Sequence, residues 1–484
     1  MLFNSIDFAI FLPIVFFLYW FICRGGAIQQ NVLAVAASFV FYGWWDWRFL
    51  ILMSITIACS WASGIWMTNV RERDREKKNP KRRARAVMVG NIVLNLLILG
   101  FFKYYNFFAQ GFADAFTLFG KELNPTTLKI ILPVGISFYT FQALSYSIDV
   151  YREKLQPTRN AVAFFAFVSF FPQLVAGPIE RATNLLPQFY SKRVFDYAKA
   201  SDGARQILWG LFKKMVVADN CALAVNRIFE EHYAVGGSDL VMGAALFAFQ
   251  IYCDFSGYSD IAIGTARLFG IGLKKNFSFP YFSRDIAEFW RRWHISLTTW
   301  FRDYVYIPLG GSRGGRGQKI RNTFVIFLAS GLWHGANWTF VVWGAYHALL
   351  FVPLLLLGRN RKYTDSVATG RKLPTLKEFA GIAMTFVLVT IGWIIFRARD
   401  MRQTIEYMAG MCDASLFSIP IHGRVACLYA VIFLVIEWLG RGQEYAIERL
   451  PVKRAGVRWV IYGAIALFIA TSSGASEQFI YFQF

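Results

Sequence analysis

The chain is poor in charged residues. Aspartate, glutamate, lysine and arginine make up 17% of its 484 residues, whereas hydrophobic residues make up 56% and aromatic residues 18%. A soluble domain has about 25% charged and about 45–50% apolar residues. So little polar surface cannot cover a water-exposed globule, and the apolar content excludes a disordered chain. The composition therefore predicts an integral membrane protein.

Cysteine and histidine are also scarce, with six and five residues respectively. No cysteine pair has the C-x-x-C spacing and no histidine has a zinc-ligand spacing, so neither a disulfide scaffold nor a metal site is indicated. The net charge of +21 would suggest nucleic acid in a soluble protein. Here the cations lie between apolar runs, as in loops that face anionic lipid. We therefore expect membrane lipid, and no nucleic acid, as a partner.

Apolar runs follow one another along the whole chain. At roughly 20 residues per crossing they predict an all-α polytopic fold with about 11–13 membrane segments, some re-entrant or interfacial. We find no internal repeat and no long linker, so we expect a single membrane domain over 1–484. The candidate segments are the run before Arg24 and the ranges 31–47, 49–67, 87–102, 130–150, 161–178, 204–225, 238–271, 322–339, 340–357, 379–396, 425–439 and 456–472.

The basic loops predict the orientation. The most basic loop, 71–85, belongs in the cytoplasm, so three preceding crossings place the N-terminus outside. The first apolar run lacks a basic n-region and an A-x-A-like site, so we expect a retained span rather than a signal peptide. If an odd number of crossings lies between 179 and 283, the C-terminus is outside and the other basic loops are also cytoplasmic, namely 151–160, 284–321, 358–377 and 440–455.

Ionisable side chains inside apolar runs are functional candidates by default. His334 lies in SGLWHGANW (330–338), between two glycines and beside Trp333. Glycines permit close approach of a backbone or substrate, and tryptophans can enclose a narrow passage. Burial without a counter-ion keeps a histidine neutral and able to accept a proton, as a general base for a hydroxyl nucleophile must. The alternative is a packing histidine between helices.

A second histidine, His294, lies 40 residues earlier, in EFWRRWHISLTTWFRDYVYIPLGG (288–311). Tryptophans alternate with arginines there, which predicts a helix at the membrane interface whose cations reach head groups. His294 could face the same cavity as His334 and orient the acceptor or support the developing oxyanion. The alternative is an interfacial anchor.

Two carboxylates, Asp254 and Asp260, occur in the membrane-like stretch YCDFSGYSDIAIG (252–264). With the nearby hydroxyls they could orient the histidines or line a proton or substrate path. The alternative is a set of caps and buried hydrogen bonds at a helix break near Gly257. The glycine-rich PLGGSRGGRG (308–317) could cradle donor phosphates, but it lacks the P-loop spacing, which favours a flexible cytoplasmic turn.

Together these motifs resemble the membrane-bound O-acyltransferase family. Within it the chain is similar to the bacterial branch that contains the alginate O-acetylation membrane component and the teichoic acid D-alanyl transfer protein. The similarity extends over nearly the whole chain, in the segments MLFNS (1–5), DFSGYSD (254–260), FWRRWHISL (289–297), RDYVYIPLGG (302–311), GLWHG (331–335) and FIYFQF (479–484).

The resemblance implies that His334 is the catalytic histidine and that His294 occupies the second active-site position. It also implies a ring of helices around a tunnel that joins the two membrane faces. An acyl group from a thioester, acetyl-CoA, would enter from the cytoplasm. An acceptor hydroxyl would attack from the outer side, on a periplasmic partner protein or on an exopolysaccharide such as alginate.

We therefore expect a multi-pass O-acetyltransferase of the bacterial inner membrane that binds no cofactor, with His334 as general base and His294 assisting. Two alternatives stay open. One is a transporter of an acyl carrier or ion, which predicts internal pseudo-symmetry. The other is a structural subunit, in which both histidines are dispensable. The residues expected to line the substrate path or support the histidines are Asp254, Ser256, Tyr258, Asp260, Trp293, Arg302, Asp303, Trp333 and Asn337.

Overall fold

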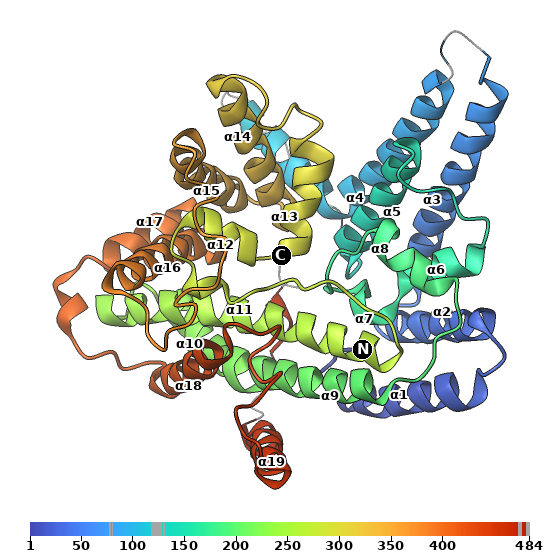
Figure 1. Cartoon of the computed structure of the whole chain (residues 1–484). Coiled ribbons are helices and arrows are strands. Elements are labelled where there is room, and N and C mark those ends of the chain that lie inside the picture. Colours follow the sequence, from blue (N-terminus) through green and yellow to red (C-terminus); the bar gives the residue numbers. More distant parts are fainter. Residues whose placement is uncertain (77–78, 80, 118–127, 129–130, 473–476, 481–484) are drawn as a thin grey trace. The chain divides into compact units, whose positions relative to one another are not determined.

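The computed structural model describes residues 1–484 except 77–78, 80, 118–127, 129–130, 473–476 and 481–484 (Figure 1). All regular secondary structure in the described residues is helical, which confirms the all-α prediction. Three predicted features fall partly outside the described residues: the basic loop 71–85, the segment 130–150 and the ending 479–484.

The helices confirm a polytopic membrane protein. Two apolar helical segments, Ile6–Ile22 and Ala27–Gly43, are shorter than the six long helices named below. Other predicted segments are short or interrupted, and the predicted total therefore stays a prediction. Six helices of the described chain are long and apolar enough to cross a membrane: α3 (Arg48–Arg73), α4 (Lys81–Thr117), α11 (Gly237–Leu268), α15 (Trp338–Leu356), α16 (Leu376–Arg397) and α19 (Ala455–Ser472).

The chain divides into two compact units, which are described separately. The first comprises Met1–Ala200 and Thr265–Leu273. Its α3 and α4 pack against each other and against α5, where Ser60, Asn91 and Ser147 form a buried hydrogen-bonded group. Besides α3 and α4 it contains α1 (Ile6–Phe17), η1 (Leu18–Ile22), α2 (Ala27–Gly43), α5 (Ile136–Tyr151), α6 (Ala161–Ser169), α7 (Phe171–Leu174), α8 (Ala182–Leu185) and η2 (Leu186–Phe189).

The second unit comprises Ser201–Gly264 and Lys274–Phe484, and it holds all the predicted site residues. The bulk of α11 lies in this unit, as do α15, α16 and α19. Its other helices are α9 (Tyr197–Leu211), η3 (Phe212–Ala218), α10 (Asp219–Glu230), η4 (Pro280–Phe282), α12 (Ile286–Arg292), α13 (Ile295–Phe301), η5 (Arg302–Tyr306), α14 (Arg316–His334), α17 (Met401–Gly410), η6 (Ala414–Phe417) and α18 (Arg424–Gly440).

Helix α11 is continuous through Gly257, so the alternative of a helix break there is wrong. The glycines instead let α9 approach α11 closely. A Cβ atom on Gly257 would lie 2.8 Å from the carbonyl oxygen of Gly210, and one on Gly264 would lie 2.5 Å from that of Gly203. Small residues at a helix contact are typical of membrane packing.

Glycines also allow α14 and α15 to pack closely against each other. A Cβ atom on Gly331 would overlap the carbonyl of Phe340, and one on Gly344 would overlap the carbonyl of Phe327. Gly331 of the GLWHG motif therefore allows the backbones of the two helices to approach closely. The close contact fixes the end of α14, where His334 lies.

Candidate active site

His294 lies between α12 and α13 in a strained backbone conformation. Its φ of +43° and ψ of +53° fall in the left-handed region, which residues other than glycine rarely adopt. Such a conformation costs about 1–3 kcal/mol and persists only where the surroundings hold it. The side chain is 1% exposed. The local fold therefore directs an imidazole into the interior at this point.

Asn276 holds the ring of His294. Its Oδ1 lies 3.1 Å from Nδ1 of His294 and also accepts hydrogen bonds from the backbone N–H and the hydroxyl of Ser296. Its amide nitrogen donates to the hydroxyl of Ser259 on α11, at 3.3 Å. Because a backbone N–H can only donate, the atom that faces it is the amide oxygen, which can only accept. The proton of the His294 ring is therefore on Nδ1.

Burial makes His294 a neutral base. It lowers the pKa of the imidazole to about 3, so the ring carries no charge at pH 7. With the proton on Nδ1, the lone pair is on Nε2. Within the described part of the chain, no group forms a hydrogen bond with this buried Nε2. The atom is therefore able to accept a hydrogen bond from a bound hydroxyl.

His334 is the last residue of α14 and is 5% exposed. Its ring is surrounded by aromatic side chains, with the centroids of Trp333, Trp343 and Phe396 at 5.0, 5.2 and 5.2 Å. The ring of Trp333 also lies 5.8 Å from that of His294. The structure thus brings both predicted histidines against one tryptophan. We call His294, His334, Asn276 and Trp333 the histidine site.

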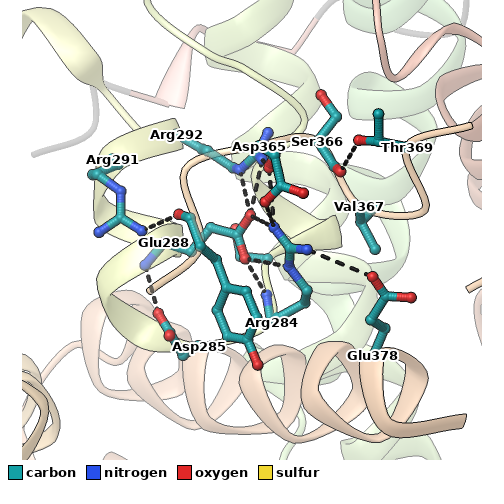
Figure 2. A network of polar contacts seen from close by, with 12 residues as sticks. Arg284, Asp285, Glu288, Arg291, Arg292, Asp365, Ser366, Val367, Thr369 and Glu378 are labelled. Carbon is teal, nitrogen blue, oxygen red and sulfur yellow. Dashed lines mark hydrogen bonds and ion pairs between the residues drawn. The ribbon is translucent and has the colours of Figure 1, made fainter. Parts of the chain in front are cut away.

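An arginine network holds α12, which leads into His294 (Figure 2). Buried Glu288 accepts hydrogen bonds from Arg284 at 3.0 Å and Arg292 at 2.8 Å. Arg284 also pairs with Asp365 at 2.9 Å, in the loop between α15 and α16. Arg291 donates to two carbonyls of the same loop. A buried carboxylate requires such partners.

This network corrects one part of the prediction of an interfacial helix, namely that Arg291 and Arg292 reach head groups. The region forms two short helices, α12 and α13, on either side of His294, and Arg291 and Arg292 bond within the protein instead of reaching head groups. Arg302 pairs with its neighbour Asp303 at 2.6 Å, and its side chain is 57% exposed. The sequence pattern could not show that a loop some 70 residues away supplies the partners.

The two predicted carboxylates, Asp254 and Asp260 on α11, bind lysines and not the histidines of the histidine site. Asp254 pairs with Lys214 at 2.9 Å, and Asp260 pairs with Lys213 at 2.5 Å. Lys213 also donates to Ser256 at 2.9 Å. We call these four charged residues the α11 charge cluster. The α11 residue that is connected to His294 is Ser259, which accepts a hydrogen bond from Asn276.

Sequence reasoning missed both lysines, although a signal was present. They form the pair in LFKKMVV (211–217), inside the predicted segment 204–225, where an ionisable side chain is a candidate by default. A cavity of about 20 Å³ is lined, among others, by Lys213 and Asp260 of the charge cluster, by Lys275 and by Asn276 of the histidine site. That volume holds about one water molecule and no substrate.

The other predicted residues have structural contacts. The ring of Trp293 packs 5.0 Å from Phe277, and that of Tyr258 packs 5.0 Å from Phe479. Asn337 caps α15 and donates to the carbonyl of Arg399. Among the described residues, no group of three histidine, cysteine or carboxylate side chains is arranged to hold a metal ion.

An all-helical membrane protein with two buried histidines on one tryptophan, one of them held as a neutral base, has the features of a membrane-embedded group-transfer enzyme. The sequence profile of the membrane-bound O-acyltransferase family matches residues 152–377, which include both histidines. The chain is 41% identical to the probable alginate O-acetylase AlgI of Pseudomonas aeruginosa, over 90% of this chain and 80% of the relative.

Two other relatives share less of the sequence. The chain is 34% identical to the peptidoglycan O-acetyltransferase of Helicobacter pylori, over 83% of this chain and 77% of the relative. It is 26% identical to the teichoic acid D-alanyltransferase of Bacillus subtilis, over 57% of this chain and 71% of the relative. The chain belongs to the membrane-bound O-acyltransferase family and is an O-acyltransferase, which confirms the resemblance. The alternatives of a transporter and of a structural subunit are therefore wrong.

Proposed function

We propose that the protein transfers an acetyl group from acetyl-CoA, on the cytoplasmic side of the bacterial inner membrane, to a hydroxyl of a polysaccharide such as alginate, directly or through a periplasmic partner protein. The proposal draws its substrate class from the relatives named alginate O-acetylase and peptidoglycan O-acetyltransferase. The observation that carries it is the histidine site, in which Asn276 holds His294 as a neutral base beside Trp333 and His334.

The reaction needs one base and one group that positions the acceptor. The acceptor oxygen attacks the thioester carbonyl while its proton passes to His334. The tetrahedral intermediate then collapses, the C–S bond breaks, and the proton passes from His334 to the leaving thiolate, so that no proton is gained or lost. The ring of His334 lies among aromatic side chains, with the ring centroids of Trp343 and Phe396 both at 5.2 Å.

The tautomer of His294 decides between its two proposed roles. A group that stabilises an oxyanion must donate a hydrogen bond. With its proton on Nδ1 and bound to Asn276, His294 has no proton on Nε2 to donate. We infer that His294 orients the acceptor by accepting a hydrogen bond from one of its hydroxyls.

Sealed vesicles that contain the full-length protein test the donor, its side and the acceptor together. Labelled acetyl-CoA, which does not cross a bilayer, is supplied on one face and alginate oligosaccharide on the other. We expect labelled oligosaccharide only with the donor on the face of the basic loops and the oligosaccharide on the opposite face. Equal labelling from either face would contradict the proposed route. Labelling of peptidoglycan fragments but not of alginate would contradict the proposed acceptor.

A further inference from the structure

An apolar groove runs between α3 and α4, which lie side by side in the first unit (Figure 1). Its volume is about 780 Å³. Sites for small molecules occupy about 300–1,000 Å³. Along most of its length its walls are Cys59, Ala62, Ser63, Trp66 and Val70 on α3, and Ala86, Val87, Gly90, Asn91 and Leu94 on α4.

Small side chains leave this space open. Around a Cβ atom built on Gly90 there is no heavy atom within 4 Å, whereas most helix-contact glycines of the chain would clash. From Cys59 to Arg73 the wall extends over 14 residues, or about 21 Å at 1.5 Å per residue. Half of a bilayer's hydrocarbon core is about 15 Å thick. The groove is therefore long enough for one acyl chain with its head group at the end.

The head-group end of the groove is positively charged. Arg73, Asp74 and Arg83 line it, and Nε of Arg83 lies 3.6 Å from Oδ2 of buried Asp74. The charged side chains that line this end are thus two arginines and one aspartate, which gives the lining an excess of positive charge. This end belongs to the basic loop 71–85, which the positive-inside rule places in the cytoplasm. The cytoplasmic leaflet is the one that carries anionic lipid.

We propose that the groove binds one anionic phospholipid, with its phosphate between Arg73 and Arg83 and one acyl chain along α3 and α4. Guanidinium groups match phosphate oxygens in geometry as well as charge. Only 17% of the apolar window of α4 is buried within the protein, so this helix is open to the bilayer that supplies the lipid. The site lies in the first unit and does not depend on the proposed acetyl transfer.

Native mass spectrometry of the intact purified chain tests the site. The protein is titrated in mixed micelles with phosphatidylglycerol or with phosphatidylcholine of identical acyl chains. We expect one retained phosphatidylglycerol, bound about tenfold more tightly than phosphatidylcholine. The double variant Arg73→Gln/Arg83→Gln loses this preference. The matched control Arg82→Gln/Arg85→Gln removes two exposed arginines of α4 that do not line the groove, and it keeps the preference.

Gly90→Phe is the second test, because it fills the groove from a position with open space and leaves every charge in place. We expect it to lose the retained lipid with an unchanged melting temperature, even if the arginine variant does not fold. Equal retention of both lipids by the wild type would overturn the proposal. So would a loss of preference in the Arg82/Arg85 control as large as in the groove variant, or full retention in Gly90→Phe.

Discussion

The histidine site and the α11 charge cluster lie in the same unit and are both largely buried, yet their polar atoms make different contacts. In the charge cluster each carboxylate of α11 is paired with a lysine of η3, at 2.5 Å for Asp260 and 2.9 Å for Asp254. In the histidine site Asn276 contacts Nδ1 of His294, and no described group forms a hydrogen bond with Nε2.

The comparison shows two roles of buried polar groups. Paired charges stabilise the fold, whereas a neutral imidazole is available for chemistry. A buried charge is costly unless it is paired, and once paired it has little capacity left for a substrate. A neutral imidazole costs less to bury and retains an acceptor atom. We therefore expect substitutions in the charge cluster to change stability, and substitutions in the histidine site to change turnover.

The largest effect is expected for His334→Ala. Loss of a general base lowers kcat by about 10²–10⁴-fold. The substitution removes a buried ring that packs among aromatic side chains, so the melting temperature of the variant is measured to check that it is folded. The control is His232→Ala, a histidine that bonds to Glu406 at 3.2 Å, away from the site. A kcat within twofold of the wild type in His334→Ala would remove His334 from the reaction.

The next largest effect concerns stability. Lys214 pairs with both Asp254 and Asp219, so Lys214→Met leaves two buried carboxylates without their cation. Removing one partner of a buried pair costs about 3–5 kcal/mol. Asp254→Asn should cost less, because Lys214 keeps Asp219. Thermal unfolding in detergent measures both variants. A smaller loss in Lys214→Met than in Asp254→Asn would show that the cluster is not held by these pairs.

Asn276 is expected to have an intermediate effect on turnover. Loss of a group that orients an active-site imidazole typically costs about 10–100-fold, and we expect this for Asn276→Ala. With its pKa near 3, His294 stays neutral across pH 5–8 in the wild type and adds no acid limb there. In Asn276→Asp a carboxylate faces Nδ1 and raises the pKa of His294, so activity should fall at the acidic end of this range. An unchanged pH–rate profile would contradict the contact between residue 276 and Nδ1 of His294.

The smallest effect is expected for Arg302→Gln. The sequence predicts support of the histidines by Arg302, but the side chain is 57% exposed and pairs with the adjacent Asp303. Exposed substitutions change free energies by about 0.5 kcal/mol or less, so kcat/KM should stay within about twofold. Steady-state kinetics with varied acceptor concentration would detect a larger loss of kcat/KM. Such a loss would show that Arg302 lines the substrate path.

The sequence was sufficient for the class of protein, and it identified two histidines as candidates for the active site. Apolar runs, glycines and the isolated imidazole in GLWHG each carry a local physical signal, and the structure places His294 and His334 against the same tryptophan. Asn276 carries no such signal. It lies 18 residues before His294 in the unremarkable stretch KKNFS (274–278), and only the tertiary fold brings the two together.

The partners of the buried charged residues also could not be predicted from the sequence. The pairing of Lys213 with Asp260 follows from how η3 packs near α11, and that of Arg284 with Asp365 from how a loop folds back on α12. From the sequence, Asp254 and Asp260 could orient the histidines, line a proton or substrate path, or form buried hydrogen bonds, and the pattern did not show that lysines are their partners. An ionisable residue inside an apolar helix is expected to need a charged partner. The sequence does not show which residue that partner is.

The most direct test of this contrast is acetyl transfer per folded molecule, from labelled acetyl-CoA to oligosaccharide, in His334→Ala and Lys214→Met side by side. The folded fraction of each variant is measured on the same sample. We predict that His334→Ala is folded and inactive, whereas Lys214→Met is less stable but as active per folded molecule as the wild type. A folded Lys214→Met without activity, or an active His334→Ala, would contradict the account.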